Sequence, residues 1–154
     1  MKCALVTGGS RGIGSAICQK LAEDSNYHIL INYQSNITAA ENTLAEVIKR
    51  GTTGEIIQFN VSNSEEVITV LTSWQENNPE AIVEVIVNNA GITKDGLFMW
   101  MTHADWNDVI NTSLNGFFNV TNFFIQKMLR NKYGRIVNLV SGSGVKGTPG
   151  QTNY

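Results

Sequence analysis

The stretch Thr7-Gly8-Gly9-Ser10-Arg11-Gly12-Ile13-Gly14 decides the fold of the chain. It stands between a short apolar run, Cys3–Thr7, and residues 13–22, whose apolar side chains recur at a helical spacing. Glycines between a strand and a helix permit a tight turn, and they let a pyrophosphate approach the free N–H groups at the start of the helix. This order of strand, glycines and helix predicts a dinucleotide-binding βαβ unit.

Apolar runs rich in Val and Ile alternate with amphipathic segments along the rest of the chain. We expect strands at Cys3–Thr7, Tyr27–Tyr33, Glu55–Val61, Ala81–Asn88 and Arg135–Val140, and helices at Ile13–Ala22, Ala39–Ile48, Ser64–Trp74 and Asp105–Leu129. Near-continuous apolar strands that alternate with helices are typical of a parallel sheet covered on both faces. The expected fold is an α/β, doubly wound Rossmann-type sheet with strand order 3-2-1-4-5, in a single domain over residues 1–154.

The composition argues against several classes of protein. A net charge of −2, with no long run of Lys or Arg, does not suit a nucleic-acid binder. The apolar runs are far shorter than the ~20 residues of a membrane helix, and Gly8 comes too early for a signal peptide. Cys3 and Cys18 lie in apolar patterns, which predicts buried free thiols and a reducing cytoplasm. No metal site is expected, because the two histidines lack ligand neighbours.

Three motifs together resemble the short-chain dehydrogenases/reductases. The glycines of Thr7–Gly14 are spaced G-x-x-x-G-x-G, as in the glycine signature of that family. Asn88-Asn89-Ala90-Gly91, directly after the fourth expected strand, is similar to its second signature. Ser141 and, thirteen positions later, Tyr154 are similar to its catalytic Ser and Tyr. The likeness spans the whole chain, which corresponds to about the first three-fifths of a usual member.

The resemblance implies a nicotinamide cofactor. The residues that we expect to bind it are Gly8, Ser10, Arg11, Gly12, Ile13, Gly14, Asn32, Tyr33, Ser35, Asn60, Val61, Asn88, Asn89, Ala90 and Gly91. An acidic residue after the second strand would repel a 2′-phosphate, and Asn32–Ser35 contains none. Arg11 can pair with a phosphate, and a basic residue at this position accompanies NADPH in the family. We therefore expect NADPH; the alternative for Arg11 is a solvated surface charge.

The reaction centre is expected at Ser141 and Tyr154, with Gln151 as a further substrate contact. Ketone reduction needs a proton donor for the carbonyl oxygen, which the family's Tyr supplies with help from a Lys four positions later, here beyond residue 154. The family also uses an Asn on the long fourth helix, where this chain has Ser113. Asn111 and Asn115 are each two residues from Ser113 and face other directions on a helix, which puts the usual proton relay in question.

Within the family, the segments after the fourth strand look most like 3-oxoacyl-(acyl-carrier-protein) reductases of fatty-acid synthesis, and acetoacetyl-CoA reductases share nearly the same pattern. Two other interpretations stay open. One is a reductase of another ketone, in secondary metabolism or polyester synthesis. The other is a non-catalytic module that binds a nucleotide or a partner. The basic residues Lys127, Arg130 and Lys132 could receive an acidic carrier protein, or they could simply complement the helix dipole.

The long expected helix Asp105–Leu129 carries more apolar side chains than one stripe facing a sheet requires. Since the family forms tetramers through this helix, we expect a homotetramer. The apolar cluster Phe98–Met101 could line the substrate cleft, join an interface or belong to the core. Residues 141–154 are rich in Gly, Ser and Thr, and the edge strand before them is apolar and unprotected. We expect the 154 residues to be the front part of a longer chain.

Overall fold

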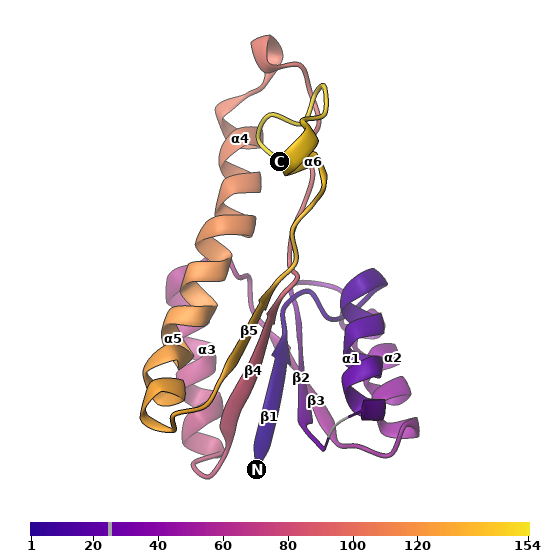
Figure 1. Ribbon diagram of the computed structural model, residues 1–154, viewed down its shortest axis with the longest axis vertical. Coiled ribbons are helices and arrows are strands. Elements are labelled where there is room, and N and C mark those ends of the chain that lie inside the picture. Colours follow the sequence, from indigo (N-terminus) through magenta and orange to yellow (C-terminus); the bar gives the residue numbers. More distant parts are fainter. Residues whose placement is uncertain (25) are drawn as a thin grey trace.

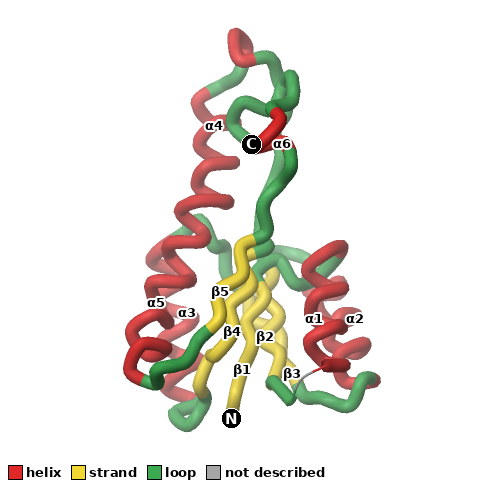
Figure 2. The backbone as a smooth tube through the Cα atoms, viewed as in Figure 1, coloured by secondary structure: helices red, strands yellow, loops and turns green. Residues whose placement is uncertain are grey.

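The computed structural model describes residues 1–24 and 26–154 as a parallel sheet between two layers of helices (Figures 1 and 2). The strands are β1 (Lys2–Val6), β2 (His28–Tyr33), β3 (Gly54–Gln58), β4 (Ile82–Asn88) and β5 (Arg135–Asn138). The helices are α1 (Gly12–Asp24), α2 (Ile37–Lys49), α3 (Ser64–Asn77), α4 (His103–Ile110), α5 (Gly116–Arg130) and α6 (Ser143–Lys146), with the short turns η1 (Phe98–Trp100) and η2 (Asn111–Asn115).

The five strands lie in the order β3-β2-β1-β4-β5, and every pair is parallel. The central strand β1 places Leu5 beside Leu30 of β2 and Ile86 of β4. The prediction of a doubly wound α/β sheet with this order is confirmed. Because all strands run the same way, the loops that follow β1, β2, β3, β4 and β5 meet at one edge of the sheet, where a ligand can reach them together.

Two apolar cores lie on opposite faces of the sheet, because successive side chains of a strand point to opposite sides. Ala4 and Val6 of β1 pack with Cys18 of α1 and Val47 of α2. Cys3 and Leu5 pack on the other face with Leu71 and Phe124, on the side that α3 and α5 cover (Figure 1). Each fully buried large side chain of this kind contributes about 1.5–3 kcal/mol to folding.

Both cysteines are buried and free, as predicted. Burial disfavours the charged thiolate and raises the pKa of Cys3 to about 11 and that of Cys18 to about 12. The two thiols therefore act as small apolar side chains in the two cores.

The long helix that the sequence predicts over Asp105–Leu129 is interrupted by a π-helical turn at Asn111–Asn115. Within this turn, the Thr112 hydroxyl donates to the carbonyl of Asp108 at 2.8 Å, a back-bond that bends helices. After the turn, α5 comes so close to the loop after β3 that a Cβ on Gly116 would lie 2.7 Å from the Val61 side chain. The side chain of Asn119 also donates to the Val61 carbonyl at 2.9 Å. The wide turn and the glycine thus seat α5 against the loop after β3.

Other boundaries differ modestly from the sequence expectations. The third strand ends at Gln58 and the fifth at Asn138, because the chain turns into loops at the carboxyl edge before the apolar pattern stops. A core role for Phe98–Met101 is wrong: Phe98, Met99 and Trp100 are 67–76% exposed at the far tip of the molecule (Figure 1), and Met101 is only half-buried. Within the described residues, no helix combines the length and apolar character that crossing a membrane requires.

Candidate functional site

The glycine turn after β1 requires its glycines for steric reasons. Gly8 and Gly12 have φ angles of +61° and +55°, which side chains rarely adopt. Gly14 lies in the first turn of α1, and a Cβ there would come within 2.2 Å of the Gly8 carbonyl oxygen. The turn therefore folds back on the helix and leaves a backbone cradle at the start of α1, which suits a pyrophosphate.

Polar side chains at the ends of three strands, Thr7, Asn32 and Asn89, brace this cradle. The Asn32 amide accepts the Gly8 N–H at 3.1 Å and donates to the Phe59 carbonyl at 3.0 Å. The Asn89 amide donates to the carbonyl of Gly8 at 3.1 Å, and the Thr7 hydroxyl accepts the N–H of Asn89 at 3.0 Å. Asn32 and Asn89 were expected as cofactor contacts, and their side chains also hold the loops after β1, β3 and β4 together.

A cleft of about 410 Å³ opens beside the glycine turn. Its walls contain every residue expected to bind a cofactor except Asn88, namely Gly8, Ser10, Arg11, Gly12, Ile13, Gly14, Asn32, Tyr33, Ser35, Asn60, Val61, Asn89, Ala90 and Gly91. We call it the turn cleft. The glycine turn forms one side, and the segment Tyr33–Asn36 after β2 forms the other.

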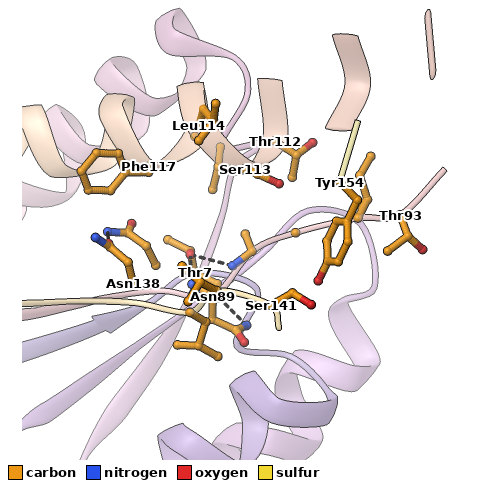
Figure 3. Close-up of a pocket in the computed structure, with 18 of the residues that line it drawn as sticks. Thr7, Asn89, Thr93, Thr112, Ser113, Leu114, Phe117, Asn138, Ser141 and Tyr154 are labelled. Carbon is orange, nitrogen blue, oxygen red and sulfur yellow. Dashed lines mark hydrogen bonds between the residues drawn. The ribbon is translucent and has the colours of Figure 1, made fainter. Parts of the chain in front are cut away.

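A second cleft, of about 720 Å³, is lined by Ser141, Tyr154, Ser113 and Asn88 among others; we call it the serine–tyrosine cleft (Figure 3). Figure 3 shows the Tyr154 ring directing its hydroxyl toward the side of the cleft where Ser141 lies. The two clefts share lining residues, including Ala90, Gly91 and Thr112, so they form one continuous groove along the carboxyl edge of the sheet.

The groove has a simple electrostatic character. In the part of the chain that the structure describes, Arg11 carries the one charged side chain among the residues that line the two clefts. Its guanidinium and the start of α1 both favour an anion in the turn cleft. The serine–tyrosine cleft offers hydroxyl and amide groups among apolar walls, which suits a neutral carbonyl group.

Ser113 lies in the π-helical turn and faces the serine–tyrosine cleft together with Thr112. The side chains of Asn111 and Asn115 do not take the place of the family's Asn at position 113. They bond each other instead, because the Asn115 amide donates to the Asn111 side-chain oxygen at 2.7 Å. Thr112 was not expected at the site, although it lines both clefts. The sequence feature that could have indicated Thr112 is its position directly before Ser113.

The segment that carries Tyr154 is fastened to the loop after β4. The Asn153 side chain is 5% exposed and donates to the carbonyls of Lys94 and Asp105 at 3.0 and 3.1 Å. Gln151, expected as a substrate contact, donates instead to the Asp95 carboxylate at 2.9 Å and is not among the residues that line the cleft. Asn153 was missed, because an Asn in a Gly- and Thr-rich loop gives no periodic signal.

Comparisons with known proteins agree with this geometry. The sequence model of the short chain dehydrogenase family matches residues 2–154. The chain is 43% identical over 153 residues to a 3-oxoacyl-[acyl-carrier-protein] reductase of Staphylococcus epidermidis, covering 99% of this chain and 62% of the relative. It is 41% identical over 151 residues to the reductase of that name from Synechocystis (98% of this chain, 60% of the relative) and 40% identical over 153 residues to an acetoacetyl-CoA reductase of Cupriavidus necator (99% and 61%).

The chain thus spans about three-fifths of the length of these relatives. The family match covers the glycine turn, the Asn-Asn-Ala-Gly segment and both residues of the Ser141–Tyr154 pair. The chain belongs to the short chain dehydrogenase family.

Proposed function

We propose that the protein is an NADPH-dependent reductase that converts a 3-oxoacyl thioester into the 3-hydroxyacyl thioester in fatty-acid synthesis. The observation that carries the proposal is the continuous groove, which joins an anion-binding glycine turn to the Ser141 and Tyr154 hydroxyls. The names of the relatives support a 3-oxoacyl thioester over other ketones. Residues 1–154 would form its nucleotide-binding domain, and the free cysteines suit a cytoplasmic location.

The residues of the turn cleft fit a dinucleotide. Side chains at Gly8 and Gly14 would collide with Ala90 and with the Gly8 carbonyl, so the glycines keep the turn folded and the start of α1 open to a pyrophosphate. Arg11, with the hydroxyls of Ser10 and Ser35, would hold the 2′-phosphate. A bound nicotinamide cofactor supplies the hydride that the carbonyl carbon accepts.

Ser141 and Tyr154 would act on the carbonyl oxygen of the substrate. The Ser141 oxygen accepts the N–H of Ser143 at 3.2 Å, which leaves the Ser141 proton free to bond and polarise the carbonyl. As the C=O π bond breaks and hydride arrives at carbon, Tyr154 would give its proton to the oxygen. Ser113 would face the same reacting region across the cleft.

We propose two roles for the basic residues Lys127, Arg130 and Lys132, stabilisation of the end of α5 and reception of an acidic carrier protein, and nothing in the structure favours one over the other. They lie at the end of α5, about 20 Å along the helix from the π-helical turn that lines the groove (Figure 1). Burial, with the charge of Arg130 adding to it, lowers the pKa of Lys127. Cations at a helix C-terminus complement its dipole.

The full-length gene product should reduce an acetoacetyl thioester with NADPH, and Tyr154→Phe should lower the turnover rate at least about a hundredfold, the usual contribution of a general acid. Tyr133→Phe is the matched control, because Tyr133 lies beside Lys2 and Arg135, outside the groove. The measurement is NADPH absorbance at saturating substrate, with carrier-bound and CoA-bound substrates compared. Binding of NADPH without reduction of any ketone would favour the non-catalytic module instead.

Arg11→Glu should abolish or reverse the preference for NADPH over NADH, because it places a negative charge beside the 2′-phosphate. Losing one charge-assisted contact costs about 1.5–3 kcal/mol, or roughly tenfold to a hundredfold in dissociation constant. Arg130→Glu makes the same charge change far from the groove and should keep the preference. Equal binding of both cofactors by the unmodified protein would refute the assignment of Arg11.

Ser113→Asn should retain or raise the turnover rate, because it restores the amide that the family uses at this position. A Ser hydroxyl has one donor and is shorter than an amide, so it spans the cleft less well. The test compares steady-state rates of the two full-length proteins. A fall of more than about a hundredfold, or ~2.7 kcal/mol of barrier, would show that Ser113 has a separate role of its own.

We further propose that the protein assembles as a homotetramer through the outer face of α5. Val120 and Phe124 of this helix are buried against the sheet, whereas Phe118 is 60% exposed, as is Leu114 of the π-helical turn that precedes the helix. A helix that is apolar on both faces is usually covered on both. This supports contact between copies of the chain.

Phe118→Glu in the full-length protein should shift the assembly from tetramers to smaller species, because it buries a charge in the contact. Ile68→Glu on α3 is the control, since Ile68 is 56% exposed and lies outside α5. Light scattering at micromolar concentration measures the mass. A monomeric unmodified protein, or a Phe118→Glu tetramer, would contradict the proposed interface.

A further inference from the structure

A buried chain of hydrogen bonds connects α1, α2 and the glycine turn. The Thr43 hydroxyl on α2 is 3% exposed as a residue, and it lies 2.9 Å from the Ser10 carbonyl and 2.8 Å from the Ser15 hydroxyl. The Gln19 amide donates to the same Ser15 hydroxyl at 3.1 Å. A hydroxyl has a single proton, so Thr43 gives its proton to the Ser10 carbonyl and accepts that of Ser15.

The bond to Ser10 acts on Arg11 through the peptide group that joins them. The described residues contain no cis peptide bond, so the Ser10 carbonyl and the Arg11 N–H point in opposite directions in one plane. Holding the carbonyl toward α2 therefore fixes the direction of the Arg11 N–H and the place from which the Arg11 side chain starts. Among the residues that the structure describes, none forms an ion pair with the exposed Arg11 guanidinium, so this backbone anchor matters.

Thr43 also ties together the two walls of the turn cleft. Ser10 and Arg11 belong to one wall, and Tyr33–Asn36 to the other. The second wall leads directly into α2, which Asn36 caps by accepting the Ala39 N–H at 2.9 Å. The Thr43–Ser10 bond crosses from this helix to the first wall and so sets the distance between them.

We propose that Thr43 is a positioning residue for the 2′-phosphate of the cofactor, acting through the Ser10–Arg11 peptide without touching the ligand. The inference rests on the proposed preference for NADPH, and it adds a selectivity residue that lies outside the cleft lining. A buried hydroxyl costs free energy unless it is bonded, and here Thr43 bonds the phosphate-binding turn at Ser10 and the first turns of α1 at Ser15.

The test is Thr43→Val, which keeps the shape of the side chain and removes the hydroxyl. In the full-length protein, the dissociation constant for NADPH should rise about three- to tenfold, the effect of one hydrogen bond, while that for NADH changes less than about twofold. Thr38→Val on the exposed side of α2 is the matched control and should change neither. Nicotinamide fluorescence measures both constants, and thermal melting reports stability separately.

A double-mutant cycle with Arg11→Ala separates selectivity from general stability. If Thr43 acts through Arg11, Thr43→Val should have little further effect on NADPH binding once the guanidinium is gone. An equal loss for both cofactors, or the same loss in both backgrounds, would overturn the inference. Thr43→Ser retains the hydroxyl and should keep the unmodified ratio; loss of the ratio there would also overturn it.

Two further outcomes are distinguishable. If Thr43→Val does not fold, Ser15→Ala tests the same chain of bonds, and an unchanged cofactor ratio in that variant would overturn the inference. If the unmodified protein binds both cofactors equally, the proposed NADPH preference fails, and the role of Thr43 fails with it. If the preference is present and Thr43→Val leaves it intact, only the role of Thr43 fails.

Discussion

The close contact between α1 and the Gly8 carbonyl is the constraint on which the rest of the structure depends. A Cβ at Gly14 would stand 2.2 Å from that oxygen and 2.6 Å from the Asn89 amide nitrogen. The missing side chain therefore lets the helix start directly beside β1. As a result, the N–H groups at the start of α1 lie next to the glycine turn and to the loop after β4. Any larger residue would have to separate the helix from the sheet edge where the groove lies.

The polar groups around this contact organise the groove before any ligand arrives. Side-chain amides of Asn32 and Asn89 bond backbone groups of the turn, and the Asn88 amide donates to the Thr121 hydroxyl of α5 and to the Asn138 side-chain oxygen of β5. These residues sit where parallel strands end, so each amide can reach the loop of a neighbouring strand. The backbone donors and hydroxyls that remain then face the groove, and Arg11 supplies its positive charge. Preorganised donors of this kind need little rearrangement on binding.

Much of the fold could be predicted from the sequence, because strands and helices here leave regular apolar patterns. The glycine spacing located the turn, and the strand order followed from the alternation of elements. The π-helical turn Asn111–Asn115 could not be predicted, since it lies within a continuous helical pattern of apolar residues.

The candidate site was less accessible to sequence reasoning. Asn153 and Thr43 bond backbone groups dozens of residues away, and a pairing at such distance leaves no local signature. Gln151 shows the converse: it was expected to contact the substrate, whereas its side chain donates to the Asp95 carboxylate. Polar residues at the ends of strands predicted where the site lies. They did not predict whether each side chain faces the groove or bonds the backbone of a neighbouring loop.

The most direct test of the account is a crystal structure of the full-length protein with bound NADP⁺. We expect the adenosine and its 2′-phosphate in the turn cleft, with the phosphate within hydrogen-bond distance of the Arg11 guanidinium. We also expect the nicotinamide ring in the serine–tyrosine cleft, beside the hydroxyls of Ser141 and Tyr154. A dinucleotide bound elsewhere, or one whose 2′-phosphate points away from Arg11 into solvent, would contradict this expectation.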